Sequence, residues 1–193
     1  MNSSLSNIVT PLLNWYHTYA RTLPWRQSPS AYHIWVSEIM LQQTRVEAVK
    51  AYYNRFTVEL PTIADLAACQ EEKLLKLWEG LGYYNRVRNM QKAAIQVMTQ
   101  YHGEMPHSYE ELLKLPGIGS YTAGAVASIA YGIPVPAVDG NVLRVITRMT
   151  ENYGDITKQN TKDEITRQLQ AIIPKQHAGD FNQALMELGA TVC

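Results

Sequence analysis

The stretch Leu115-Pro116-Gly117-Ile118-Gly119-Ser120-Tyr121-Thr122-Ala123-Gly124 decides the fold. It reads as the end of one helix at Leu115, a tight turn with Gly117 and Gly119, and a second helix that begins at once. Glycine at both turn positions lets the backbone come close to another group, and the amides at the start of the second helix point outward. Such a turn binds a phosphate without a charged side chain. An ordinary hairpin of two helices, which needs glycine to reverse direction, explains the segment equally well.

The rest of the chain also has the apolar periodicity of helices, and alternating strand patterns are scarce. A loop is expected over residues 23–29 and an extended connector over 134–138, because proline and the residue before it disfavour a helix. Ser28 or Ser30 is expected to cap a helix that runs from there to about Thr44. We expect the other helices over residues 5–19, 85–101, 109–113, 122–131, 141–151, 162–173 and 181–192. The prediction is an all-α protein with short loops.

The composition fits a folded chain of one domain or two small lobes, with 193 residues of which 46% are hydrophobic. The formal net charge is zero, so a nucleic-acid binder with this sequence must gather its basic groups on one face. No stretch reaches the length of a transmembrane helix, and the N-terminus lacks the order of a signal peptide. Cys69 and Cys193 make no disulfide framework, which favours a reducing, cytoplasmic location.

Asp139 directly precedes a predicted helix, which makes it a candidate N-cap. A carboxylate at this position stays ionised, because the helix dipole favours an anion. A persistent anion can also stabilise a cationic sugar intermediate. The capping interpretation and the functional interpretation are therefore compatible.

Glu38 lies in the apolar segment Ile34–Thr44, and helical spacing puts Trp35 and Leu41 on its side of the helix. If the glutamate is buried, desolvation raises its pKa and makes it a proton donor near neutral pH. If it lies at the edge of the helix beside Gln42, it reaches solvent and is an ordinary surface carboxylate. Periodicity alone favours the edge.

Several segments together resemble a known superfamily. The turn at 115–119, followed by Val138-Asp139-Gly140-Asn141-Val142, resembles the helix-hairpin-helix and the Gly/Pro-Asp loop of the endonuclease III superfamily of DNA glycosylases. Trp35–Thr44, Leu81–Tyr84 and Glu187–Cys193 are similar to one branch of it, the adenine DNA glycosylases. The matches run in the same order over essentially the whole chain.

The resemblance implies a helix-hairpin-helix glycosylase fold, in which two helical lobes flank a DNA-binding cleft. One lobe is expected over residues 26–133, and the other over residues 1–25 together with 134–193. The partner is expected to be duplex DNA that contains adenine opposite 8-oxoguanine or guanine. No membrane is implied, the chain is expected to be a monomer, and its place is the cytoplasm at the bacterial nucleoid.

The resemblance also implies a base excision repair enzyme that hydrolyses the N-glycosidic bond of the mispaired adenine. Glu38 would protonate the departing adenine, and Asp139 would stabilise the cationic sugar or capture it covalently. Tyr121 and Asn141 would hold these carboxylates by hydrogen bonds. Tyr121 also takes the position of the lysine with which strand-cleaving relatives form a Schiff base. A phenol cannot form an imine, so a monofunctional glycosylase is expected.

Further DNA-binding residues follow from the resemblance. Gln43 and Tyr83 match residues that enter the base stack after the adenine is flipped out. Thr44 and Leu81 match contacts around the opposite base. The pocket for the extruded base would be lined by Trp25, Arg26, Leu41 and Gln183. Ordinary alternatives are core positions for Leu41 and Leu81, and a surface ion pair for Arg26.

Cys193 matches the first ligand of the four-cysteine loop that holds a 4Fe-4S cluster in full-length members of the family. The other three ligands of that loop are missing from this sequence. We therefore expect no cluster in this chain, and a truncated form of a longer protein.

Two other functions fit part of these features. A mismatch glycosylase that removes thymine can share Tyr121 and both carboxylates. A non-catalytic helix-hairpin-helix module would bind DNA only. Glu38 and Asp139 argue against the module, because neither is needed to bind phosphate.

Overall fold

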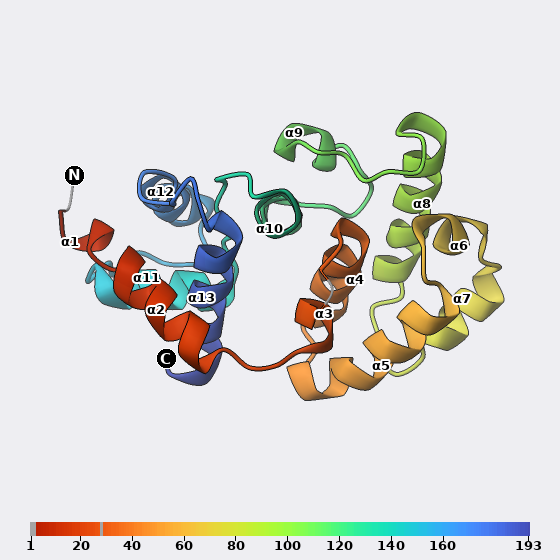
Figure 1. Cartoon of the computed structure of the whole chain (residues 1–193), viewed down its shortest axis with the longest axis horizontal. Coiled ribbons are helices and arrows are strands. Elements are labelled where there is room, and N and C mark those ends of the chain that lie inside the picture. Colours follow the sequence, from red (N-terminus) through yellow and green to blue (C-terminus); the bar gives the residue numbers. More distant parts are fainter. Residues whose placement is uncertain (1–2, 28) are drawn as a thin grey trace. The chain divides into compact units, whose positions relative to one another are not determined.

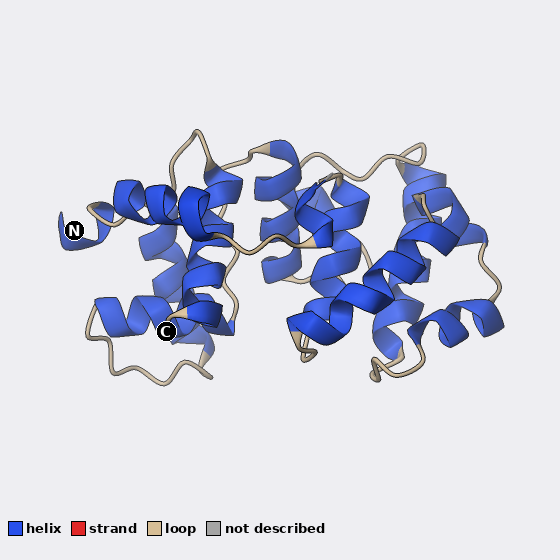
Figure 2. Ribbon diagram, turned by 60° about the horizontal axis from the view of Figure 1, so that its bottom comes forward, coloured by secondary structure: helices blue, strands red, loops and turns tan. Residues whose placement is uncertain are grey.

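The computed structural model describes residues 3–27 and 29–193, and these residues form helices and loops without a strand (Figures 1 and 2). The all-α prediction is confirmed. The helices are α1 (Ser3–Ser6), α2 (Val9–Tyr19), α3 (Pro24–Gln27), α4 (Ala31–Leu41), α5 (Val46–Glu59), α6 (Ile63–Ala68), α7 (Glu71–Trp78), α8 (Asn85–Gln100), α9 (Tyr109–Leu112), α10 (Ser120–Tyr131), α11 (Gly140–Met149), α12 (Gln159–Gln170) and α13 (Ala178–Thr191).

The N-terminal third differs from the sequence-based expectation in two places. The helix expected over residues 5–19 is divided into α1 and α2, and Pro11 lies in the first turn of α2, where its missing N–H is not needed. The expected loop at 23–29 contains the short helix α3, which Pro24 begins. Ser30 is the cap of α4, since its Oγ accepts from the His33 backbone N–H at 3.1 Å. The other candidate cap, Ser28, lies outside the described residues.

The chain forms two compact units, Thr22–Ala123 and Met1–Arg21 together with Gly124–Cys193. The border between the units falls inside α10. The lobe boundaries expected at residues 26 and 133 stay a prediction. The expected connector at 134–138 carries neither helix nor strand.

The unit Thr22–Ala123 is built around large buried side chains. In it α4 packs against α5, and α6 packs against α8. The Phe56 and Trp78 rings meet edge to face at 6.0 Å between centroids. Its largest fully buried side chains are Trp35, Met40, Phe56, Leu66, Leu74, Trp78, Met90, Leu112 and Leu115. Most of α4, the helix that carries Glu38, is buried in this unit.

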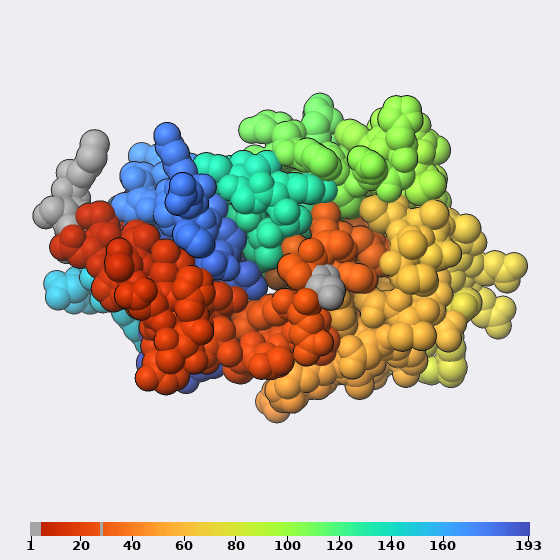
Figure 3. Space-filling model, in the orientation of Figure 1, coloured from red at the N-terminus to blue at the C-terminus, as the bar shows by residue number. Residues whose placement is uncertain are grey.

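The second unit brings the N-terminal and C-terminal helices together, because α13 packs against both α2 and α11. In the space-filling view the red N-terminal residues lie beside blue C-terminal ones (Figure 3). The guanidinium of Arg21 pairs with the buried carboxylate of Glu187 at 2.6 Å and fixes the chain after α2 to α13. Phe181 and Leu185 on α13 are fully buried in this core.

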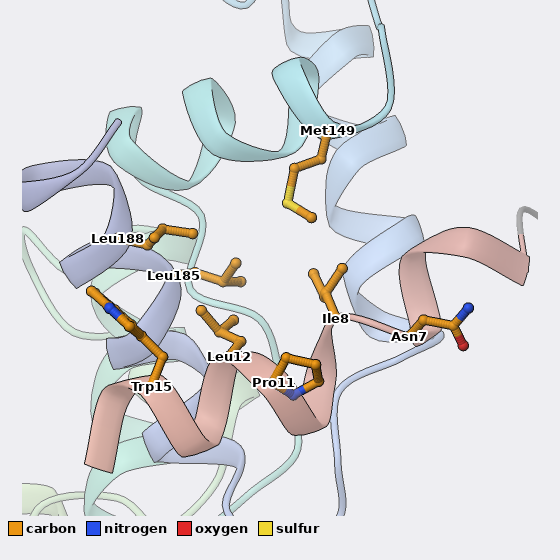
Figure 4. A pocket seen from close by; sticks show the side chains of 8 residues that line it. All are labelled: Asn7, Ile8, Pro11, Leu12, Trp15, Met149, Leu185 and Leu188. Carbon is orange, nitrogen blue, oxygen red and sulfur yellow. The ribbon is translucent and has the colours of Figure 1, made fainter. Parts of the chain in front are cut away.

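An apolar groove lies on this second unit, and Figure 4 shows side chains from α2, α11 and α13 around it. Its lining residues are Asn7, Ile8, Pro11, Leu12, Trp15, Met149, Leu185 and Leu188. Within the described part of the chain, no helix combines the length and apolarity that crossing a membrane requires.

Candidate functional site

Glu38 is buried, with 6% of its surface exposed. It lies on α4, on which Trp35 and Val36 are fully buried. The Tyr121 hydroxyl donates a hydrogen bond to the Glu38 Oε2. The alternative that places Glu38 at a solvent-exposed helix edge is therefore wrong. Periodicity missed this burial because the neighbour is supplied by α10, 83 residues further along the chain. A buried carboxyl with a phenol donor is a candidate for proton transfer.

The turn before α10 needs glycine at one of its two expected positions. Gly117 has a φ of +77°, and a Cβ on it would lie 2.8 Å from the Asn89 Cβ. Gly119 has no protein atom within 4 Å of such a Cβ, so packing within the chain does not require glycine there, and its expected close approach to a phosphate stays a prediction. Both glycines are exposed, while Leu115 and Ile118 anchor the turn in the core. The start of α10 is thus open to a phosphate.

The motif continues into the other unit through Gly124. A side chain at this position would collide with the carbonyl oxygen of Pro136. The connector before α11 therefore runs directly against α10, and it leads to Asp139. Asn182 on α13 holds the same connector, accepting from the Ala137 N–H at 3.1 Å and donating to the Val135 carbonyl at 2.9 Å.

Asp139 is the N-cap of α11, as expected. Its Oδ1 accepts from the Val142 backbone N–H at 2.8 Å, and its Oδ2 accepts from the Asn141 side-chain amide at 2.8 Å. The Val142 N–H and the Asn141 side-chain amide thus each hold one of the two carboxylate oxygens in place. The arrangement keeps the carboxyl group in a fixed orientation at the start of the helix.

Sequence reasoning missed Arg144, which holds Asn141. The Arg144 Nη2 donates to the Asn141 Oδ1 at 2.8 Å and to the Gly189 carbonyl at 2.5 Å. This contact turns the amide nitrogen of Asn141 toward Asp139. The spacing of three residues between Asn141 and Arg144 on one helix is a signal that could have found it.

The expected pocket residues fall in both units. Trp25 on α3 is buried, and its ring meets the Tyr53 ring edge to face at 5.4 Å. Arg26 and Leu41 are half-buried on α3 and at the end of α4. Gln183 is half-buried on α13, in the other unit. Their role in binding an extruded base stays a prediction.

The two residues expected to enter the base stack have the same unusual backbone conformation. Gln43 has a φ of 60° and Tyr83 a φ of 47°, which places both in the left-handed region that non-glycine residues rarely adopt. Both side chains are exposed, Tyr83 by 67%. Thr44 and Leu81, which are expected to contact the opposite base, are less exposed: Thr44 is half-buried and Leu81 is buried. Exposed side chains on strained backbone are typical of functional loops.

A second residue that sequence reasoning missed is Arg86, which lies in the first turn of α8. Its guanidinium donates to the backbone on both sides, at the end of α4 and at the turn before Tyr83. No local pattern marks such a residue, since its partners are backbone carbonyls, and those at the end of α4 lie more than 40 residues away in the sequence.

Cys193 and Cys69 are free cysteines and belong to different units. Arg148 donates to the Cys193 carbonyl at 2.7 Å and approaches its Sγ at 2.8 Å. Among the described residues, no group of three or more His, Cys, Asp or Glu side chains is arranged to hold a metal ion. A 4Fe-4S cluster takes four thiolates, so the two cysteines of this chain do not fit it.

Comparisons with known proteins agree with this architecture. Residues 36–175 match the family described as HhH-GPD superfamily base excision DNA repair protein. The adenine DNA glycosylase of Mus musculus is 45% identical over 94% of this chain and 37% of its own length. That of Buchnera aphidicola subsp. Baizongia pistaciae is 42% identical over 94% of this chain and 52% of its own length. The chain therefore spans between about a third and a half of these relatives.

Solved structures have the same fold. A thermostable thymine-DNA glycosylase superposes with a TM-score of 0.88 and 28% identity, covering 100% of this chain and 88% of that one. A trapped covalent intermediate of endonuclease III with DNA has a TM-score of 0.81 and 25% identity, covering 97% and 85% of the two chains.

Proposed function

The chain belongs to the HhH-GPD superfamily of base excision DNA repair proteins, and from this premise we propose that it is a monofunctional adenine DNA glycosylase. The reaction is hydrolysis of the N-glycosidic bond of adenine opposite 8-oxoguanine or guanine in duplex DNA. The observation that carries the proposal is the buried Glu38 carboxyl with the Tyr121 hydroxyl on its Oε2. The adenine glycosylase relatives at 42–45% identity support the choice of base.

Glu38 is the general acid of this reaction. Adenine leaves poorly as an anion, so protonation of a ring nitrogen makes it a tolerable leaving group. The buried side chain excludes bulk water from the proton, and the hydrogen bond from Tyr121 fixes the direction of the carboxyl group. As the bond to adenine breaks, positive charge develops on the sugar.

Asp139 stabilises that positive charge, by its field or by a transient covalent bond that water then hydrolyses. The two hydrogen bonds from Val142 and Asn141 support this role, because they hold both carboxylate oxygens in a fixed orientation. Arg144 contributes indirectly, because it holds the Asn141 side chain that donates to Asp139. The division of labour between two carboxyl groups is the same as in glycoside hydrolysis.

Tyr121 limits the chemistry to base removal. A lysine at the start of α10 could attack the sugar and form an imine, whereas a phenol cannot. The chain therefore releases adenine and leaves an abasic site for another activity to cleave.

The proposed partner is duplex DNA, bound by one monomer. The exposed glycines of the turn before α10 support phosphate binding, and the exposed Gln43 and Tyr83 support entry into the opened base stack. Thr44 and Leu81 are proposed to contact the opposite base. Trp25, Arg26, Leu41 and Gln183 are proposed to receive the extruded adenine. The proposed location is the bacterial cytoplasm, at the nucleoid.

We further propose that this chain by itself holds no iron–sulfur cluster. Its two cysteines lie in different units and supply half of the thiolates that a 4Fe-4S cluster takes. No step above involves such a cluster. Iron analysis of the purified chain tests this proposal, and stoichiometric iron would contradict it.

Single-turnover assays on three matched duplexes test the proposed function. Adenine should be released opposite 8-oxoguanine and opposite guanine, while thymine opposite guanine should stay intact. Release of thymine alone would support the thymine glycosylase alternative, which the structural similarity to a thymine-DNA glycosylase keeps in view. Binding to all three duplexes without release of any base would support the non-catalytic module.

A further inference from the structure

Arg86 joins two loops that are far apart in the sequence. Its Nη1 donates to the backbone carbonyl oxygens of Ile39 at 2.8 Å and Gln42 at 2.5 Å. Its Nη2 donates to the carbonyl of Leu81 at 3.0 Å. One guanidinium therefore links the end of α4 to the turn that precedes Tyr83.

These contacts serve α4 rather than the helix to which Arg86 belongs. The last carbonyls of a helix lack partners within it, and a cation near them is favourable. In the first turn of α8 the same charge faces the positive end of the helix dipole, which is unfavourable. The planar guanidinium of an arginine can donate hydrogen bonds to both loops at once, whereas the single ammonium of a lysine cannot.

Each of the two loops ends in a strained and exposed residue. Gln43 directly follows Gln42, and Tyr83 comes two residues after Leu81; both have left-handed backbone. Such a conformation persists only where the surroundings hold it. The Arg86 guanidinium also lies 5.6 Å from the centroid of the Tyr83 ring. Both exposed side chains are thus held through one residue.

We propose that Arg86 is a positioning residue, which fixes the loops of Gln43 and Tyr83 in the conformation that enters the DNA base stack. The inference rests on the proposed function, since it takes these loops to be the part of the chain that opens duplex DNA. Side chains that enter a base step unstack it and support extrusion of the target nucleotide. Loss of the link should therefore impair opening of the duplex more than the chemistry that follows.

The first test measures opening without the chemistry. A duplex carries the fluorescent base 2-aminopurine at the target position, and the parent chain should raise its fluorescence on binding. At saturating protein, Arg86→Lys should reduce the opened fraction about tenfold, the loss expected from one to two hydrogen bonds. Arg88→Lys is the matched control, because Arg88 lies on the same helix and its side chain, which pairs with Glu71, is 43% exposed. It should open the duplex like the parent.

The second test separates positioning from a general structural role. Adenine release is compared between a duplex and DNA in which the target adenine already lies in an unpaired bubble. Arg86→Lys should slow release from the duplex about tenfold more than release from the bubble. Equal slowing on both substrates, or duplex opening like that of the parent, would overturn the proposal.

Folding is controlled by a second variant. In a Tyr83→Ala background the contacts of Arg86 no longer position a Tyr83 side chain. Adding Arg86→Lys to that variant should therefore reduce duplex opening by much less than it does in the parent. Full additivity would overturn the proposal, as would a parent chain that leaves the fluorescence unchanged. A parent that opens the duplex but releases no adenine would instead contradict the proposed function, and the fluorescence comparison would still decide the role of Arg86.

Discussion

Gly189 lies directly against Asn141. A Cβ on Gly189 would be 2.6 Å from the Asn141 Cβ, so α13 can approach α11 this closely only with glycine at the contact. The carbonyl oxygen of the same glycine accepts a hydrogen bond from Arg144, which also donates to the Asn141 side-chain oxygen. The packing of two helices thus determines the position of the amide that donates to Asp139.

Gly189→Ala should displace Asn141 and lower adenine release by about tenfold or more, since overpacking a tight contact costs about 1–3 kcal/mol. Single-turnover release and thermal unfolding measure the two effects. Ala190→Ser, at the exposed neighbouring position, is the control and should leave both unchanged. Normal release by Gly189→Ala would show that the position of Asn141 does not matter for the reaction.

Asp139→Asn and Asp139→Ala separate the cap from the chemistry. Asparagine keeps an oxygen for the Val142 N–H and should preserve stability, whereas alanine loses the cap and about 1 kcal/mol. Both variants lose the negative charge, so both should lose adenine release by at least about 100-fold. Denaturant unfolding and single-turnover kinetics give the two quantities. Substantial release by Asp139→Asn would reduce the role of Asp139 to capping.

Tyr121→Lys tests the assignment of Tyr121 to the position of a Schiff-base lysine. The variant should form adducts with abasic DNA that borohydride traps, because an amine at the start of α10 can form an imine. The parent and Tyr121→Phe, which keeps the ring without the hydroxyl, should form none. Trapping by the parent chain would contradict the monofunctional interpretation.

Structural features that depend on nearby residues could be predicted from the sequence. The caps at Ser30 and Asp139 and the turn at Gly117 were predictable, because each depends on neighbours within three or four residues. The start of α6 is also marked locally, by the reciprocal hydrogen bonds of Thr62 and Asp65, but α5, α6 and α7 were not among the helices expected from periodicity. A capping box could have located that helix.

The candidate site depends more on tertiary contacts. The burial of Glu38 comes from the core around α4 and from Tyr121, and periodicity within one helix cannot report either. The family resemblance singled out Glu38 without its environment. Arg86 was missed for the same reason, since its acceptors are backbone groups that carry no side-chain signal.

Tyr53 predicts an alkaline limit to stability. Burial raises its pKa to about 12, from an ordinary value of 10.0. The folded state therefore favours the neutral phenol, and this contribution is complete below pH 10 and is lost as the pH rises from 10 toward 12. Tyr53→Phe should make the unfolding free energy less dependent on pH in that window. Tyr153→Phe, at a side chain that is 95% exposed, is the control, and an unchanged slope for Tyr53→Phe would contradict the prediction.

The central claim is that Glu38 donates the proton that lets adenine leave, and Glu38→Gln tests it most directly. Glutamine keeps the shape of the side chain but has no transferable proton, so single-turnover release of adenine opposite 8-oxoguanine should fall by at least about 100-fold. Binding of the same duplex should change little. Glu47→Gln, at a side chain that is 77% exposed, should leave release unchanged. Release by Glu38→Gln at the rate of the parent would remove Glu38 from the mechanism.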